Sequence, residues 1–275
     1  MVDQSLKNAP SAACRPRTVV GVTEIDPTRL PGEDAEPLPA DARIRWDTFK
    51  SAIGELMAAS DETDETEAAV RAVRQLMRGL DAEQYADALN VPEDAGEFAD
   101  RLRGMLVRIP DGWGRWISCE RGWYPLITEL DRALAAVLPR YRIYQVKEKF
   151  AGLRFYWDSG ERIVDPNDPE PAVVVDAESA AEEARSLADD EAWQRRLSRY
   201  LETPEGRARQ EDLDRRIELA ERLVKRAEAL AATTCERCGE PGQRCQRRNR
   251  AWYKTLCGTC AGAAGYEPVP DDDDD

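Results

Sequence analysis

The chain has 275 residues, enough for one large domain or two small ones with an apolar core. Charged side chains make up 34% of the residues and the formal net charge is -15, which disfavours a general nucleic-acid or anionic-membrane binder because long-range forces on phosphate would be repulsive. Histidine is absent, so Ser-His and Cys-His catalytic pairs and mixed Cys/His metal sites are excluded. Local basic patches remain possible, and so does catalysis through carboxylates, lysine or tyrosine.

The cysteines and the N-terminus indicate the compartment. Seven cysteines are an odd number, and three of them, Cys14, Cys119 and Cys245, have no pairing pattern. This usage is typical of a reducing compartment rather than of a secreted disulfide framework. No run of about 18 apolar residues occurs, and the N-terminus has no apolar leader segment. We therefore expect a cytoplasmic protein with no membrane partner.

The first third of the chain is expected to be a disordered arm followed by helices. Prolines recur among small and acidic residues over 1–41, where only 18–22 looks like a strand. Over 42–110 the apolar residues follow a helical period, which predicts three helices. The acidic run 61–67 suits a helix start, with a docking site for a basic partner as the alternative. The apolar faces comprise Phe49, Ile53, Leu56 and Met57, then Val70, Val73, Met77 and Leu80, then Phe98, Leu102 and Leu106.

A helix and a β-hairpin are predicted over 111–158. Three tryptophans fall within 112–124, a density typical of a core anchor, with a stacking or peptide-binding surface as the alternative. A helix with Pro125 in its first turn follows, and its wide apolar stripe must be buried. Strands are predicted at 141–147 and 153–157, around a short turn containing glycine. A lone hairpin is marginal in water, so we expect it to pack on this helix.

Residues 159–234 are expected to hold a polar loop and then two long helices. The helical pattern that begins at 176 breaks at 203–206, which contains a proline and a glycine, and then resumes up to Leu230. Two long helices around a short turn predict an antiparallel helical hairpin. The second helix leads directly into the first cysteine pair. The sequence does not tell whether the helical hairpin packs on the core or stands away from it.

Two Cys-x-x-Cys pairs near the C-terminus carry the strongest chemical signal in the chain. Eighteen residues separate the pairs, a spacing at which four thiolates close a tetrahedron around one Zn²⁺. A closed site has no open position for a substrate, which predicts a structural metal. The zinc finger is expected over 235–266, in a ribbon or treble-clef-like form, ahead of a disordered acidic tail over 267–275. The predicted ligands are Cys235, Cys238, Cys257 and Cys260.

The segment between the cysteine pairs is basic and aromatic on an otherwise acidic chain. Six positive and two negative side chains over 235–260 give +4, and four thiolates with Zn²⁺ contribute about -2, leaving about +2. Such residues can contact nucleic acid or a protein partner, or they can cap acidic helices and cover the metal. Cys245 lies among them, and we expect a spare thiol rather than a fifth ligand. The candidate contact residues are Arg244, Arg247, Arg248, Arg250, Trp252, Tyr253 and Lys254.

Four stretches of the chain resemble a family of small uncharacterised bacterial and phage proteins. They are Gly-Trp-Tyr-Pro-Leu-Ile at 122–127, Gln-Val-Lys-Glu-Lys-Phe-Ala-Gly-Leu-Arg-Phe-Tyr at 145–156, Thr-Cys-Glu-Arg-Cys-Gly-Glu-Pro-Gly at 234–242, and Trp252 with Thr-Leu-Cys at 255–257. The resemblance implies a helix, a hairpin and a zinc knuckle pair, and a phage or mobile-element origin. It brings no activity. The chain departs from the family at Ala151, where the family usually has glycine.

A helical hairpin that runs into a four-cysteine finger is also similar in layout to the DksA/TraR group, which acts on RNA polymerase. The similarity depends on this layout and on the Cys-x-x-Cys-Gly and Leu-Cys-x-x-Cys motifs. The turn at 203–206 has no motif that matches the acidic tip of that group. The likeness implies a transcription regulator as an alternative function.

Taken together, the sequence predicts a mostly helical α+β protein that holds one zinc ion. An enzyme with carboxylate or lysine chemistry is a further alternative, in which Lys147-Glu148-Lys149 or the acidic clusters would act as acid/base pairs. No phosphate-binding glycine loop or nucleophile elbow accompanies them. We therefore expect a non-catalytic interaction or regulatory protein with a protein partner, and with nucleic-acid contact through the finger as an alternative.

Overall fold

The computed structural model describes residues 30–40, 42–44, 48, 70, 87–163, 180–248 and 252–270. In the helix that begins at residue 180, the side chains are described only from residue 191 onward. The expectations for the strand at 18–22, the two helices before residue 87, the acidic run 61–67, the loop up to 171 and the acidic tail lie outside these residues or mostly so. Among the described residues, no helix combines the length and apolar character needed to cross a bilayer.

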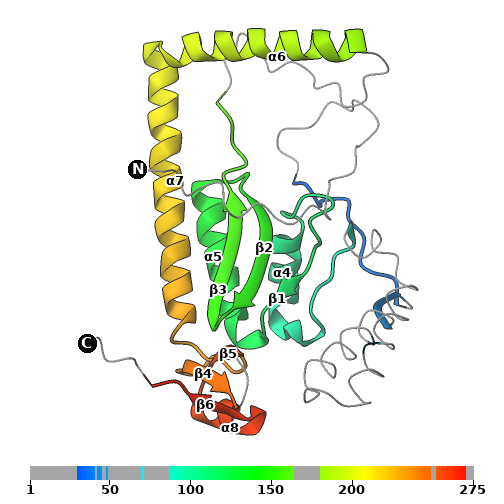
Figure 1. The fold of residues 1–275 in the computed structure, drawn as a ribbon, viewed down its shortest axis with the longest axis vertical. Helices are drawn as coiled ribbons and strands as arrows, with labels where there is room; N and C mark the ends of the chain where they lie inside the picture. Colours follow the sequence, from blue (N-terminus) through cyan, green and yellow to red (C-terminus); the bar gives the residue numbers. More distant parts are fainter. Residues whose placement is uncertain are drawn as a thin grey trace.

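The core is a three-stranded sheet covered on one face by helices (Figure 1). Strands β2 (Arg142–Lys149) and β3 (Gly152–Asp158) form the predicted hairpin. Strand β1 (Ile117–Ser118), which the sequence did not reveal because it is two residues long, pairs parallel to β2. The predicted third helix is the 3-10 helix η1 (Glu93–Phe98) followed by α4 (Ala99–Leu106).

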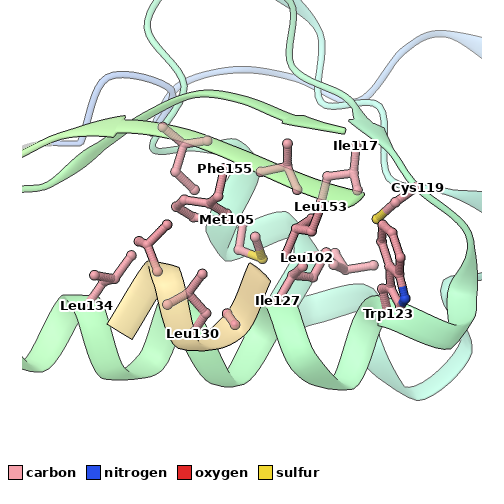
Figure 2. Packing of buried hydrophobic residues seen from close by; sticks show 14 of the residues in the cluster. Leu102, Met105, Ile117, Cys119, Trp123, Ile127, Leu130, Leu134, Leu153 and Phe155 are labelled. Atoms are coloured by element: carbon pink, nitrogen blue, oxygen red, sulfur yellow. The ribbon is translucent and has the colours of Figure 1, made fainter. Parts of the chain in front are cut away.

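Helix α5 (Tyr124–Val137) packs its apolar stripe against the sheet, as the sequence predicted. Its Ile127, Leu130 and Leu134 meet Leu153 and Phe155 of β3, with Leu102 and Met105 of α4 beside them (Figure 2). Trp123, in the 3-10 turn η2 (Arg121–Trp123) before α5, is fully buried, whereas Trp113 is 44% exposed. The tryptophan-rich segment therefore anchors the core at one position and reaches the surface at another.

The β2–β3 turn consists of Phe150 and Ala151, which both adopt positive φ, 55° and 66°. Two such residues give the backbone twist that a tight hairpin needs. The carboxylate of Glu148 accepts a hydrogen bond from the amide of Ala151 at 2.7 Å, which fixes the turn. Glycine would adopt this conformation without strain.

The two long helices are present, but they meet at a corner instead of lying antiparallel. Helix α6 (Ala180–Leu201) extends across the end of α7 (Pro204–Ala231) (Figure 1). Thr203 caps α7 by accepting from the amide of Gly206 at 3.0 Å, and a Cβ on Gly206 would fall 2.1 Å from the carbonyl oxygen of Tyr200.

The corner arises because the apolar stripe of α7 packs on the core and not along α6. The stripe lies in the same core as α5 and β3, so no continuous apolar face remains for α6 to follow. The hairpin layout behind the likeness to the DksA/TraR group is therefore absent. The buried stripe of α7 comprises Leu213, Ala220, Val224, Ala227 and Ala231.

The C-terminal finger has the order knuckle, hairpin, helix, which is the treble-clef arrangement. The knuckle at 235–238 precedes strands β4 (Gln243–Arg247) and β5 (Tyr253–Leu256), and α8 (Gly258–Ala264) follows. A further strand, β6 (Tyr266–Pro268), pairs with β4, so the ordered finger extends beyond residue 266. Cys245, Leu256 and Ala261 form a small core beside the cysteine cluster.

Candidate metal centre

The four predicted ligands converge on one point. The Sγ atoms of Cys235, Cys238, Cys257 and Cys260 all lie within 4.8 Å of one another, and those of Cys238 and Cys257 are 3.6 Å apart. A tetrahedron with Zn–S bonds of about 2.3 Å has S···S edges of roughly 3.8 Å. A donor set of four thiolates at this spacing therefore fits a soft tetrahedral ion such as Zn²⁺.

The first pair is presented by a tight knuckle. The amide of Cys235 donates to the carbonyl of Glu240 at 2.7 Å, and the amide of Gly239 donates back to Cys235 at 2.9 Å. Gly239 has φ of 81°, a left-handed conformation that glycine adopts without strain. These bonds turn the chain so that both sulfurs point the same way.

The second pair stands at the start of α8. Cys257 caps the helix, and its Sγ accepts from the amide of Cys260 at 3.4 Å. This backbone hydrogen bond, supported by contacts with the other cluster thiols, lowers the pKa of Cys257 to about 7. The hydrogen bond at the start of the helix thus favours the thiolate of Cys257, the form in which a cysteine binds a metal.

The knuckle is docked on the α/β core through the segment before α5. The indole Nε1 of Trp123 donates to the carbonyl of Thr234 at 2.7 Å, and the amide of Gly122 donates to the carbonyl of Glu236 at 2.8 Å. A Cβ on Gly122 would lie 2.3 Å from the carbonyl oxygen of Cys235, so only glycine fits there. The finger and the core are therefore in direct backbone contact at the first metal ligand.

The hairpin turn makes a second contact with the finger. The hydroxyl of Thr255 in β5 is buried and donates to the carbonyl of Ala151 at 2.6 Å. The carbonyl of Thr255 in turn accepts from the amide of Glu236 at 2.9 Å. One residue thus joins the β2–β3 turn, the finger sheet and the knuckle.

An ion-pair cluster fills the space between finger and core. Lys254 donates to both Glu120 and Glu236 at 2.7 Å, and Arg237 contacts Glu120 at 3.1 Å. Glu236 is only 1% exposed, and its burial raises its pKa, against the attraction of Lys254.

Burial alone would lower the pKa of Lys254, but the charge of Glu236 and the hydrogen bonds to both carboxylates outweigh it and raise that pKa. Burial also raises the pKa of Glu148, whose charge adds to the repulsion that Glu236 feels. The ammonium of Lys254 thus pairs with Glu236 in the finger and with Glu120 in the core, and so links these two parts of the molecule.

The candidate contact residues do not form one free surface. Lys254 is committed to the cluster just described, and Arg248 pairs with Glu267 at 2.7 Å. Arg244 lies over the ring of Tyr253 at 4.3 Å. Trp252 is 44% exposed, Arg247 is partly exposed, and Arg250 lies outside the described residues.

The remaining cysteines are not ligands where the structure describes them. Cys245 is buried in the finger core, with its thiol facing the carbonyls of Gln243 and Leu256, and it is outside the four-cysteine cluster. Cys119 is buried in the main core, where burial raises its pKa above the ordinary thiol value. Cys14 lies outside the described residues.

Sequence reasoning missed the docking residues. Nothing in the pattern marks Glu236 as buried, or Glu120 and Glu236 as ion-pair partners of Lys254, because both stand among ordinary charged residues. Gly122 opens the Gly-Trp-Tyr-Pro-Leu-Ile segment at 122–127, but the knuckle residue that it meets, Cys235, is 113 residues away in sequence. Comparison of the chain with protein-family models, with curated proteins and with solved structures found no match in any of the three.

Proposed function

We propose that this protein is a non-catalytic zinc-binding interaction protein in which the metal fastens the finger to the α/β core. The convergence of the four thiols, with the first knuckle held against Gly122 and Trp123, carries this proposal. A Cys₄ donor set saturates a tetrahedral ion, so a bound zinc ion would have no position left for a substrate.

The metal would act by closing the finger, which is too small to fold on apolar burial alone. Its own core consists of a few residues around Cys245 and Leu256. Small modules of this kind need a metal, disulfides or a partner surface for stability. Here the partner surface is the core itself, so the finger is expected to be part of the domain rather than a separately moving reader.

An interaction role follows from what the fold leaves exposed. The finger presents Trp252 and Arg247 to solvent, and the core presents Trp113, Phe150 and Tyr156. We propose a macromolecular partner, a cytoplasmic location, and a phage or mobile-element origin as suggested by the resembling family. The polymerase-regulator alternative loses its layout argument because α6 turns away from α7.

Metal analysis of the purified chain tests the metal role. We expect one zinc per chain by native mass spectrometry, and loss of that zinc in Cys257→Ser together with loss of the near-ultraviolet signal of Trp123. Cys245→Ser is the matched control, because this thiol is 1% exposed in the same finger yet lies outside the cluster. Equal zinc in Cys257→Ser and the unchanged chain would overturn the proposal.

A further inference from the structure

The outer face of the β1–β2–β3 sheet is the surface that points away from α4 and α5. Ile117, Val146 and Phe155 are buried on the inner face, so their strand neighbours point outward. Cross-strand pairing places Ser118, Lys147 and Arg154 in one row, and Gln145 and Tyr156 in the next. We call these residues, together with Tyr144 and Trp113 beside them, the outer sheet face.

Two positive charges face each other on this surface. Lys147 and Arg154 are directly opposite in the β2–β3 register. Like charges directly opposite each other destabilise a sheet, whereas opposite charges at such a position stabilise it. Here the two heads diverge: Lys147 lies over the ring of Tyr156 at 5.4 Å, while Arg154 donates to the carbonyl of Leu153 at 3.0 Å.

The basic side chains of the outer sheet face form no ion pairs within the part of the chain that the structure describes. This holds for Lys147 and Arg154, and for Lys149 at the end of β2. Two carboxylates lie nearby: burial raises the pKa of Glu148 while the charge of Arg154 acts to lower it, and Asp158 accepts a hydrogen bond from Tyr144. The chain carries 54 acidic against 39 basic side chains, so partners were abundant. Basic side chains without ion pairs on such an acidic protein make this surface locally positive, which favours the approach of an anion.

Aromatic rings accompany these charges. Tyr156 is 40% exposed and Trp113 is 44% exposed. The ring of Trp113 packs against that of Tyr144 with centroids 4.7 Å apart, which holds the indole in place while leaving part of it open. Rigid, half-exposed rings beside lysine and arginine are the combination that receives unpaired bases and their phosphates.

We propose that the outer sheet face binds single-stranded nucleic acid, with bases stacked on Tyr156 and Trp113 and phosphates held by Lys147 and Arg154. This names the partner class of the proposed interaction role and rests on it. In a duplex the bases already stack on one another and cannot reach the rings, so a single strand is the form that uses both features. An acidic peptide would satisfy the charges but leave the rings unused.

The test uses the full zinc-loaded chain and the fluorescence anisotropy of labelled oligo(U) and oligo(dT) in low salt. We expect binding that weakens as salt rises, because each neutralised phosphate releases counterions. Tyr156→Ala should weaken binding by about fivefold or more, the effect of one lost stacking contact. Lys147→Glu should weaken it by about tenfold through charge reversal. Binding of oligo(U) alone would identify RNA, and binding of both probes would identify backbone and base stacking as the common target.

Matched controls separate this surface from general charge and from the finger. Lys225→Glu reverses an exposed lysine on α7, and Trp252→Ala removes an exposed ring of the finger; both should bind as the unchanged chain does. Thermal unfolding of each variant shows that it is folded.

Four outcomes would overturn the inference: no binding to either probe, equal binding of duplex, displacement by oligo-glutamate as efficient as by unlabelled oligo(U), or equal loss in the two controls. Zinc measured on the same sample keeps the metal role distinct, since a zinc-containing chain that fails to bind refutes only this inference.

Discussion

The indole Nε1 of Trp123 lies 2.7 Å from the carbonyl oxygen of Thr234, the residue directly before the first cysteine ligand. Trp123 is fully buried in the main core, so this hydrogen bond ties the metal site to the same packing that holds α5 against the sheet. Loss of metal is therefore expected to disturb the core at Trp123, and damage to the core is expected to disturb the metal site.

Gly122→Ala is predicted to destabilise the protein and weaken zinc binding. The new Cβ would fall 2.3 Å from the carbonyl oxygen of Cys235 and 2.6 Å from the amide nitrogen of Gly239, both backbone atoms that cannot move independently. Overpacking of this kind costs about 1–3 kcal/mol in unfolding free energy. Urea denaturation and competition for zinc with a chelator measure the two effects.

Gly104→Ala is the control for this prediction. Gly104 lies inside α4, and a Cβ there would meet no atom within 4 Å. Alanine in a helix interior should stabilise by about 0.5–1 kcal/mol. If Gly122→Ala were as stable as the unchanged chain, the close docking of finger on core would be wrong.

Lys254→Met is predicted to be strongly destabilising. Methionine fills a similar volume but leaves Glu236, which is 1% exposed, without a cation. Removing one partner of a buried pair costs about 3 kcal/mol, the lower end of the usual range because Glu120 remains 37% exposed. Equilibrium unfolding in urea gives the value.

The matched change is Arg248→Met, which breaks an exposed pair in the same finger. Arg248 and Glu267 are 71% and 58% exposed, so the loss should stay below about 1 kcal/mol. Similar losses in the two variants would contradict a structural role for the buried cluster.

Ala151→Gly is predicted to stabilise the protein. Alanine at φ of 66° is in the left-handed region, which costs an L-residue roughly 1 kcal/mol that glycine avoids. Loss of a small buried methyl offsets part of this gain, so we expect a net gain of about 0.5 kcal/mol in thermal or urea unfolding. Ala220→Gly, in the helical interior of α7, should instead lose at least about 1 kcal/mol, and a loss at both positions would refute the strain argument.

Lys147→Glu is predicted to raise stability while it removes a charge from the outer sheet face. Glutamate would stand opposite Arg154 and convert a repulsive cross-strand pair into an attractive one, worth about 0.2–1 kcal/mol. Lys147→Gln removes only the repulsion and should fall between the glutamate variant and the unchanged chain. A less stable glutamate variant would mean that the Lys147 contact with Tyr156 outweighs the repulsion.

Local patterns predicted the elements well. The alternation over 141–157, the apolar stripe of α5 and the cysteine spacing each depend on neighbours within a few turns, so periodicity and spacing were enough to place β2, β3, α5 and the four ligands. Strand β1 was not predicted because two residues are too few to show a periodic pattern, and its partner in β2 is distant in sequence.

Long-range relations were not predictable in the same way. The apolar stripe of α7 was visible, but nothing in it says whether α6 or the core will cover it; the core does. The basic finger residues were grouped by their closeness in sequence, yet Lys254 is half-buried against Glu120 and Glu236 from other elements. The sign of each charge follows from the sequence, whereas the partner with which it forms an ion pair depends on the fold.

Helix α7 also fixes the distance between α6 and the finger, which lie at its two ends. Its 28 residues, at 1.5 Å each, span about 40 Å between the corner at Thr203 and the docked finger. Because one side of this helix is packed on the core along much of its length, it acts as a rigid strut rather than a hinge. A partner that contacts both α6 and the finger must therefore bridge a fixed gap of about 40 Å, so short ligands can engage one end or the other but not both.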